Sequence, residues 1–249
     1  MKIIISPAKK MKDATADFLA ETTPIYLAQA QTIFAKLNTL DRFELKEVWR
    51  CSEKLLQENY QRLKQTDLTK DLTPALFSYD GLQYSSLAAD LLDEPSLDYL
   101  TKNLRILSGL YGILRPLDGI VCYRLEMGAK LKVERSKDLY DFWQESLYKA
   151  LYTSKEPVIN LASKEYAKAI TPYLTKDDQF ITCEFKEYDQ KRQKYVQKAT
   201  HAKQARGQFV RFLAENKVTD LKQLTDFDAM GYKYRKELST KTLYVFTKG

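Results

Sequence analysis

Residues 104–132 read LRILSGLYGILRPLDGIVCYRLEMGAKLK and contain four of the eight glycines in the 249-residue chain. Apolar residues dominate this stretch, and its five basic residues are opposed by only two acidic ones. Just upstream, the leucine spacing from Leu97 to Leu107 predicts a helix that begins at Pro95 and stops before Gly109. The stretch therefore predicts a helix that runs into a glycine-rich turn within an apolar core.

The turn between Gly109 and Gly112 is the first candidate phosphate contact. Glycine permits a turn whose backbone N–H groups remain free to bind phosphate oxygens. The arrangement resembles the hairpin of helix–hairpin–helix DNA-binding modules, although the glycines are three positions apart and no clear second helix follows. The alternative is a turn that only packs in the core. Arg115, Arg124 and Lys130 need polar partners in either case, because charged groups in an apolar stretch are costly unless paired.

A second segment holds the positive charge of the chain. Residues 190–214 contain no Asp or Glu, and their basic residues are Lys191, Arg192, Lys194, Lys198, Lys203, Arg206 and Arg211. The whole chain has 40 Lys and Arg against 33 Asp and Glu, so these seven residues account for the entire excess. A neutral body with one cationic segment is typical of a protein that binds a polyanion. Nucleic acid is therefore the first partner to consider.

The basic segment divides into a hairpin turn and a helix. Residues 180–189 and 195–200 are predicted strands on either side of the turn, and a helix follows them. Lys203, Gly207 and Arg211 lie four positions apart on one face of that helix. Glycine costs about 1 kcal/mol in a helix relative to alanine, and its place between two cations suits the close approach of a phosphate backbone. Tight packing of the helix against a neighbour is the alternative.

Strands and helices are interspersed without the regular alternation of a doubly wound sheet. Further strands are predicted at residues 1–6, 119–125, 158–161 and 243–246. Further helices are predicted at residues 23–38, 41–63 and 139–151. No linker rich in Gly, Pro or Ser divides the chain. We therefore expect one compact domain over residues 1–249 of the mixed α/β or α+β class, with a mixed sheet flanked by helices and a helix–hairpin–helix-like element.

Two loops that follow predicted strands carry further candidate contacts. Lys9 and Lys10 come shortly after the first strand, which ends at a proline. Ser163 follows a second apolar strand and caps a helix whose N-terminus, at Lys164, is open to an anion. Loops at strand ends often carry ligand contacts, so both loops are candidate binding segments.

The sequence contains little that points to catalysis or metal binding. His201 is the only histidine and has no obvious carboxylate partner, so we expect a structural or phosphate-facing role. Glu126 and Glu165 lie among cations as candidate acid–base groups, metal ligands or simple ion-pair partners. No nucleotide-loop or metal-ligand motif occurs, and we expect no cofactor, metal site or catalytic residue. The cysteines, which indicate buried thiols in a reducing compartment, are Cys51, Cys122 and Cys183.

Taken together, these segments closely resemble the YaaA peroxide-stress family from the first residues to the last. The central motifs are Leu107-Ser108-Gly109-Leu110-Tyr111-Gly112, Arg115-Pro116-Leu117-Asp118 and Tyr123-Arg124-Leu125-Glu126-Met127-Gly128. The outer motifs are Ser6-Pro7-Ala8-Lys9, Asn160-Leu161-Ala162-Ser163 with Glu165-Tyr166, Ala202-Lys203 with Ala205-Arg206-Gly207, and the closing Phe227, Gly231-Tyr232 and Ser239. The chain departs from the family pattern at Lys10, where Thr is common, and at His201, where Tyr is usual.

The resemblance implies a single-domain cytoplasmic protein that helps cells survive hydrogen peroxide. It implies that the protein keeps unincorporated iron low and so limits Fenton damage. It also implies a DNA-binding fold with a helix–hairpin–helix element and a positively charged cleft. Independently, no apolar run reaches the length of a signal-peptide core or a membrane span, so we expect no membrane partner.

The leading hypothesis is a monomeric, non-enzymatic protein that binds double-stranded or structured DNA largely without sequence specificity. Its candidate DNA-contacting residues are Lys9, Lys10, Gly109, Gly112, Arg115, Arg124, Lys130, Ser163, Lys164, Lys203, Arg206, Gly207 and Arg211. The alternative is an enzyme whose basic cleft acts on a phosphate-bearing or nucleobase substrate, with Lys9, Arg124, Glu126, Ser163 and Lys164 in its pocket. Direct iron sequestration is disfavoured, because one histidine and scattered cysteines leave only carboxylates as ligands. Within the basic segment we expect the helix, rather than the hairpin turn, to form the site.

Overall fold

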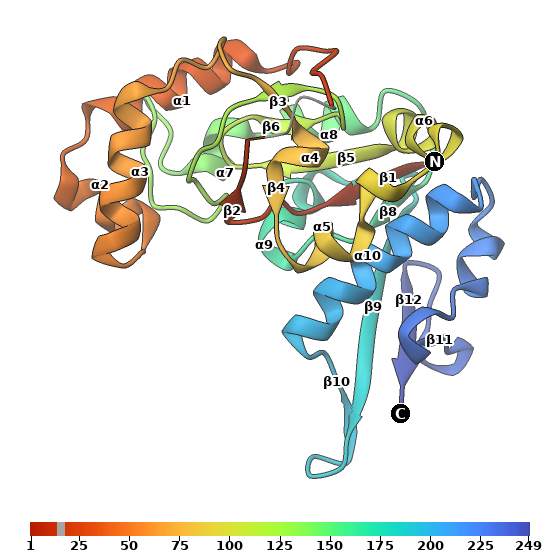
Figure 1. Ribbon diagram of the computed structural model, residues 1–249. Helices are drawn as coiled ribbons and strands as arrows, with labels where there is room; N and C mark the ends of the chain where they lie inside the picture. The colour runs from red at the N-terminus through yellow and green to blue at the C-terminus, as the bar shows by residue number, and fades with distance from the viewer. Residues whose placement is uncertain (14–17) are drawn as a thin grey trace.

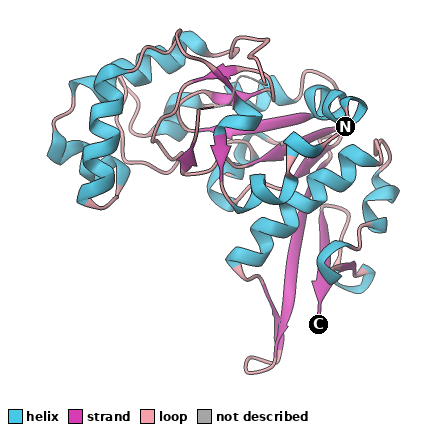
Figure 2. Cartoon of the chain, viewed as in Figure 1, coloured by secondary structure: helices cyan, strands magenta, loops and turns pink. Residues whose placement is uncertain are grey.

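Strands and helices are interspersed along the chain, which a computed structural model describes over residues 1–13 and 18–249 (Figures 1 and 2). The strands are β1 Lys2–Ile5, β2 Lys10–Met11, β3 Thr73–Pro74, β4 Tyr79–Asp80, β5 Leu104–Ser108, β6 Gly112–Leu114, β7 Gly119–Ile120, β8 Val158–Asn160, β9 Phe180–Asp189, β10 Lys194–Val196, β11 Lys233–Tyr234 and β12 Leu243–Lys248. The α-helices are α1 Leu27–Thr39, α2 Arg42–Trp49, α3 Glu53–Gln65, α4 Ala75–Ser78, α5 Leu82–Leu87, α6 Glu94–Asn103, α7 Leu139–Trp143, α8 Ser146–Leu151, α9 Lys164–Ala167 and α10 Ala199–Glu215. Short 3₁₀ turns are η1 Ala89–Leu91, η2 Thr171–Tyr173, η3 Leu221–Asp226, η4 Ala229–Gly231 and η5 Lys236–Leu238.

A mostly parallel sheet forms the centre of the molecule. Its strand order is β11-β12-β9-β8-β1-β5-β6, and β10 pairs with β9 outside that path. The pairs among β12, β9, β8, β1 and β5 are parallel, whereas β6, β10 and β11 pair antiparallel. The prediction of a mixed sheet flanked by helices is therefore confirmed.

The central strand β1 explains why the loops at its end lie at the heart of the molecule. Ile3, Ile4 and Ile5 are fully buried, as expected for a parallel strand covered on both faces. β1 pairs in parallel with β5 on one side and with β8 on the other. The carboxyl ends of β1 and β8 therefore open onto the same edge of the sheet.

The structure differs from the prediction at Leu104–Ser108, which form strand β5 rather than the last turns of a helix. Helix α6 ends at Asn103, and Ile3 then pairs with Leu104 across the parallel ladder. An apolar run buried on both faces looks alike in a helix and in a central strand, so leucine spacing alone did not separate the two.

The helix–hairpin–helix-like element is consequently not formed by these residues. The glycine-rich turn joins β5 to β6 in an antiparallel pair, with Ser108 opposite Gly112. Its residues Leu110 and Tyr111 are fully buried, so the turn does not present their backbone N–H groups to a phosphate. The alternative interpretation, that this turn only packs in the core, is therefore confirmed.

Two predicted helices are each divided by a residue in the left-handed region. Arg50, with φ 43°, ends α2 before Ser52 caps α3, so residues 41–63 form two helices. Gln144, also with φ 43°, separates α7 from α8. The predicted strand at 119–125 is shorter as well, since only Gly119–Ile120 pair in β7. Residues 121–125 lie outside the sheet, and residues 123–125 line the site described below.

Helix α10 packs against α5, α6 and β9, and Figure 1 shows it crossing beside the sheet. Ala202, Ala205, Phe209 and Leu213 are at most 2% exposed and form the buried side of this helix. Its N-terminal end follows the β9–β10 hairpin, which projects from the body of the molecule in Figure 1. The basic segment therefore runs from a protruding hairpin onto a packed helix.

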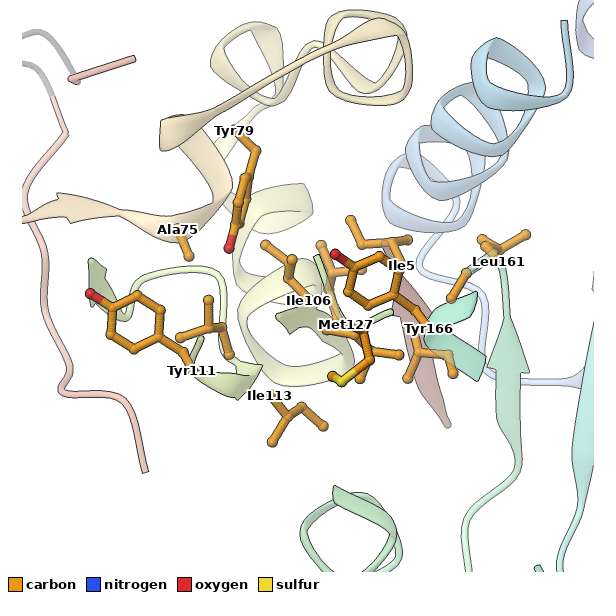
Figure 3. Close-up of a cluster of buried hydrophobic side chains, with 14 of the residues drawn as sticks. Ile5, Ala75, Tyr79, Ile106, Tyr111, Ile113, Met127, Leu161 and Tyr166 are labelled. Atoms are coloured by element: carbon orange, nitrogen blue, oxygen red, sulfur yellow. The ribbon is translucent and has the colours of Figure 1, made fainter. Parts of the chain in front are cut away.

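Buried apolar side chains form one connected cluster that extends from β1 to β12, which makes the chain a single compact domain. Figure 3 shows Ile5, Ile106 and Tyr166 within this core. In the part of the chain that the structure describes, no helix has the length and apolar character needed to cross a bilayer.

Candidate functional site

A cavity of about 450 Å³ lies where the ends of β1 and β8 meet α5 and α10. Its lining comes from five segments of the chain, namely residues 6–10, residues 80–84, residues 123–126, Ser163 with Glu165 and Tyr166, and Lys203 with Arg206. We call this space the inner cavity. Its volume is typical of a small-molecule site.

Hydrogen bonds hold the two strand-end loops of the inner cavity together. The backbone N–H of Ser163 donates to Oγ of Ser6 at 2.8 Å, which joins the loop after β8 to the loop after β1. The hydroxyl of Tyr84 donates to the backbone carbonyl of Ser6 at 3.0 Å and ties α5 to the same loop. The parallel order of β1 and β8 brings these segments together, as in other sheets whose ligands bind beyond the carboxyl ends of the strands.

Buried tyrosines form the floor of the inner cavity. The Tyr123 hydroxyl lies 2.8 Å from the Tyr79 hydroxyl and 2.6 Å from Oγ of Ser108. Burial raises the pKa of Tyr123 to about 12, so the ring stays neutral and acts as a hydrogen-bonding wall. Tyr84 and Tyr166, which also line the cavity, are 7% and 6% exposed.

Ion pairs cross the opening of the inner cavity. Nζ of Lys9 lies 3.5 Å from Oε1 of Glu126, and Nε of Arg124 lies 3.1 Å from the same oxygen. Nζ of Lys10 lies 2.5 Å from a carboxylate oxygen of Asp80. Lys9 and Lys10 are exposed, so the two pairs that they form are weak and open to exchange for another anion.

Polar atoms without a hydrogen-bond partner concentrate in this cavity. Over residues 1–13 and 18–249, five buried side-chain nitrogen or oxygen atoms lack such a partner, and four of them belong to cavity-lining residues. The four atoms are Gln83 Nε2, Arg124 Nε, Glu126 Oε1 and Arg206 Nε. Arg124 Nε and Glu126 Oε1 face each other in the ion pair described above, so Gln83 Nε2 and Arg206 Nε are the two that lack any partner. An unpartnered buried group costs about 1–3 kcal/mol, so two such donors in one cavity favour a site that a ligand completes.

A second cavity adjoins the first. It has a volume of about 570 Å³ between α9, β9 and α10, and it shares Ser163, Lys203 and Arg206 with the inner cavity. We call it the outer cavity. Its other charged lining residues are Lys164, Lys168 and Glu184. Burial lowers the pKa of Arg206, which stands between the two spaces, while Glu184 opposes that shift.

The structure thus brings together about half of the predicted contact residues. Lys9, Lys10, Arg124, Ser163, Lys203 and Arg206 line the inner cavity, and Lys164 lines the outer one. Glu126 and Glu165, which the sequence indicated as possible acid–base or ion-pairing groups, line the inner cavity as well.

The three candidate glycines are packing residues instead. A Cβ on Gly109 would lie 2.7 Å from the Leu125 carbonyl oxygen, and one on Gly112 would lie 2.7 Å from Leu147 Cδ2. A Cβ on Gly207 would lie 2.1 Å from the Gln83 carbonyl oxygen of α5. The helix-packing alternative therefore explains Gly207.

Three candidate cations lie outside both cavities. Arg115 pairs with the buried carboxylate of Asp118 at 2.9 Å and donates to the Thr23 carbonyl at 2.9 Å, which supplies the partner that its apolar surroundings required. Arg211 pairs with Glu215 at 2.8 Å and packs on the last carbonyls of α5. Lys130 is exposed.

His201 does have a carboxylate partner, contrary to the expectation from sequence. Its Nδ1 lies 2.6 Å from Oε1 of Glu187, which also accepts from the Tyr232 hydroxyl at 2.9 Å. Nζ of Lys198 lies 3.0 Å from the other Glu187 oxygen. Burial alone would raise the pKa of Glu187, but the hydrogen bonds from these neighbours hold it below its usual value. His201 lines neither cavity and has a structural role.

Sequence reasoning did not select the α5 side of the site. Asp80, Gln83 and Tyr84 all line the inner cavity, yet no motif marks them. The one available signal was Gly81, where a Cβ would lie 3.1 Å from Cβ of Ala8 and press on the loop after β1. No group of three His, Cys, Asp or Glu side chains suited to a metal ion occurs among the described residues.

Comparisons with known proteins show the family of this chain. The model of the family described as peroxide stress protein YaaA matches residues 1–238. A UPF0246 protein of Pediococcus pentosaceus is 50% identical over 248 residues, covering 100% of this chain and 98% of the relative. UPF0246 proteins of Lactiplantibacillus plantarum and Lachnoclostridium phytofermentans are 50% and 42% identical, over 99% and 100% of this chain and 98% and 97% of the relatives. The chain therefore belongs to the YaaA peroxide-stress protein family.

Proposed function

We propose that this chain is a cytoplasmic peroxide-stress protein that acts as a monomer by binding DNA, largely without sequence specificity. One observation carries the proposal, namely that Lys203 and Arg206 of α10 form the common wall of two adjoining cavities. Lys9 and Lys10 stand at one end of this surface, and Lys164 stands at the other. Cations along such a track bind phosphates without reading bases.

Ion pairing supports the helix rather than the hairpin turn as the centre of the surface. Three of the seven cations in the basic segment, residues 190–214, have acidic partners that lie outside the segment. These pairs are Arg192 with Asp189, Lys198 with Glu187 and Arg211 with Glu215. Within the described parts of the chain, Lys203 and Arg206 have no ion pair and also line the cavities. They are therefore the cations of this segment best placed to bind a phosphate.

The test compares two triple variants with the same change in net charge. One is Lys9→Glu, Lys10→Glu and Lys203→Glu at the cavities, and the other is Lys191→Glu, Arg192→Glu and Lys194→Glu at the hairpin turn. All six side chains are exposed, so both variants keep the fold. Duplex affinity is measured by fluorescence anisotropy over a range of salt concentrations.

The cavity variant should lose duplex binding at low salt, and any residual binding should show a log–log salt slope smaller by about 3, since each lost phosphate contact removes about one unit. The hairpin variant should keep the wild-type slope. An equal loss in both variants would show a response to net charge alone. A loss only in the hairpin variant would move the site to the hairpin. Either result contradicts the proposal.

In cells, the proposed role is to limit damage from free iron and peroxide. The cavity variant should fail to restore growth of a peroxide-challenged deletion strain, whereas the hairpin variant should restore it. DNA strand breaks and unincorporated iron, measured in the same cultures, separate protection of DNA from an effect on the iron pool. Wild-type rescue by the cavity variant would contradict a role for this site in the stress response.

A second candidate function rests on the carboxylate that faces the inner cavity. Glu126 lies between Lys9 and Arg124, and Ser163 lines the same space. This arrangement favours an enzyme acting on a phosphate-bearing or nucleobase substrate, with Glu126 as the proton-transferring group. Turnover of nucleotides and DNA by the purified protein, absent in Glu126→Gln, would support this function. If no product forms above background, DNA binding remains as the one proposed function.

A further inference from the structure

The inner cavity combines a polar, aromatic interior with a cationic rim, and this contrast defines the shape of its ligand. Gln83, Tyr84, Tyr123 and Tyr166 line the cavity and are each at most 8% exposed. The side chain of Lys9 is 69% exposed and that of Lys10 is 80% exposed at its edge. A ligand that fits both zones has a flat polar part for the interior and a negative group for the rim.

The polar atoms that line the cavity include both donors and an acceptor. Gln83 Nε2 and Arg206 Nε are buried donors without a partner, and Glu126 Oε1, which forms an ion pair with Arg124, is an acceptor. Gln83 is 7% exposed, so its amide is enclosed by the cavity walls. The edge of a nucleobase presents donors and acceptors side by side and therefore matches this set.

A bare phosphate matches the interior poorly. Besides the cations, three carboxylates line the inner cavity, those of Asp80, Glu126 and Glu165. They repel an anion placed among them. The buried tyrosine rings favour a flat aromatic ligand instead, because stacking on such rings is tolerant of base identity. The phosphate belongs at the rim, beside Lys9, Lys10 and Lys203.

We propose that the inner cavity binds a single unstacked nucleotide, with its base inside and its phosphate at the rim. The inference rests on the proposed function, because bound DNA would supply the nucleotide: a nucleotide within a bound strand can leave the stack and enter such a pocket. A free mononucleotide has the same chemistry. The contact of Gly207 with α5 positions the site, because it brings Gln83 and Arg206 to face the same space.

The experiment uses a duplex that carries 2-aminopurine opposite a mismatch, since the fluorescence of this base rises when it leaves the stack. The rise is read at saturating protein, and duplex binding is read separately by anisotropy. The test variant is Gln83→Met, which removes the amide at similar volume, and the control is Gln31→Met on the exposed face of α1. A second arm measures thermal shifts with nucleoside monophosphates, inorganic phosphate and ribose 5-phosphate.

For a nucleotide within a strand, wild type and Gln31→Met should show a several-fold rise in fluorescence, and Gln83→Met should lose most of it. For a free nucleotide, monophosphates should raise Tm in a manner that depends on Gln83, whereas phosphate and ribose 5-phosphate should not. The inference is overturned if the duplex binds without a fluorescence rise and no nucleotide shifts Tm, and the proposed function then stands. Gln83-dependent nucleotide shifts without duplex binding would support the pocket and overturn the DNA-binding proposal. Equal shifts with phosphate and with nucleotides would also overturn the inference.

Discussion

Replacing Gly207 with alanine tests the packing that holds the wall of the site in place. An ideal Cβ at this position would lie 2.1 Å from the Gln83 carbonyl oxygen and 2.9 Å from Cβ of Ser86. Both neighbours belong to α5, and one of them is backbone, so neither can rotate away. Helix α10 must therefore shift by about 1 Å to restore ordinary contact, and Lys203 and Arg206 shift with it.

Two opposed effects set the magnitude. Alanine favours a helix over glycine by about 1 kcal/mol. Overpacking of a close contact costs about 1–3 kcal/mol, and a clash with fixed backbone belongs at the upper end of that range. The net expectation for Gly207→Ala is a loss of about 2 kcal/mol, which for a domain of this size lowers Tm by roughly 4–8 °C.

Thermal unfolding followed by circular dichroism measures this effect. Thr200→Ala, at an exposed position of the same helix, is the control and should change stability by less than about 0.5 kcal/mol. The direction of the change in Tm decides the outcome, because without the clash the alanine would raise Tm through its higher helix propensity. A variant at or above the wild-type Tm would refute the close approach of α10 to α5.

Two further predictions concern ionisable groups that are buried or partly buried. Glu187→Gln should lower Tm at pH 7 by a few degrees, since it replaces a carboxylate that accepts hydrogen bonds from its neighbours. Because the folded-state pKa of Glu187 lies below that of the unfolded chain, its contribution is present above about pH 4.5 and is lost as the pH falls through the folded value, so the two melting curves should converge in acid. Burial raises the pKa of Cys51 and Cys183, and that of Cys122 to about 11, so these thiols should react slowly with peroxide at pH 7. Mass spectrometry after a peroxide pulse checks this, and rapid oxidation to sulfenic acid would point to a redox-sensing role instead.

The strand-end loops of the site were predictable from sequence because parallel strands leave a recognisable trace. An apolar run followed by small polar and cationic residues appears at both Ser6 and Ser163, and the parallel ladder brings their ends together. Gln83 left no such trace, since an amide on a short helix has the same appearance whether it faces solvent or a cavity. The role of Gly207 was ambiguous for a similar reason, because a glycine in a basic helix accommodates either a ligand or a neighbouring helix.

For the basic segment, the sequence did not show which cations have acidic partners. Residues 190–214 contain no acid, yet Asp189 and Glu215 lie immediately beyond its two ends and pair with Arg192 and Arg211. The hairpin turn places Asp189 beside Arg192, and the four-residue helical spacing places Glu215 beside Arg211. Local charge counting therefore overstated the number of free cations, and only the fold distinguished Lys203 and Arg206 from the rest.

The shared wall between the inner and outer cavities makes their occupancies interdependent. Arg206 lines both cavities, so a ligand that binds its side chain from one cavity changes what the side chain presents to the other. Any such effect is reciprocal, because the factor by which one occupant alters the affinity of a second equals the factor acting in the opposite direction. Two anions drawn to the same guanidinium compete, whereas two segments of one continuous strand reinforce each other through their covalent link.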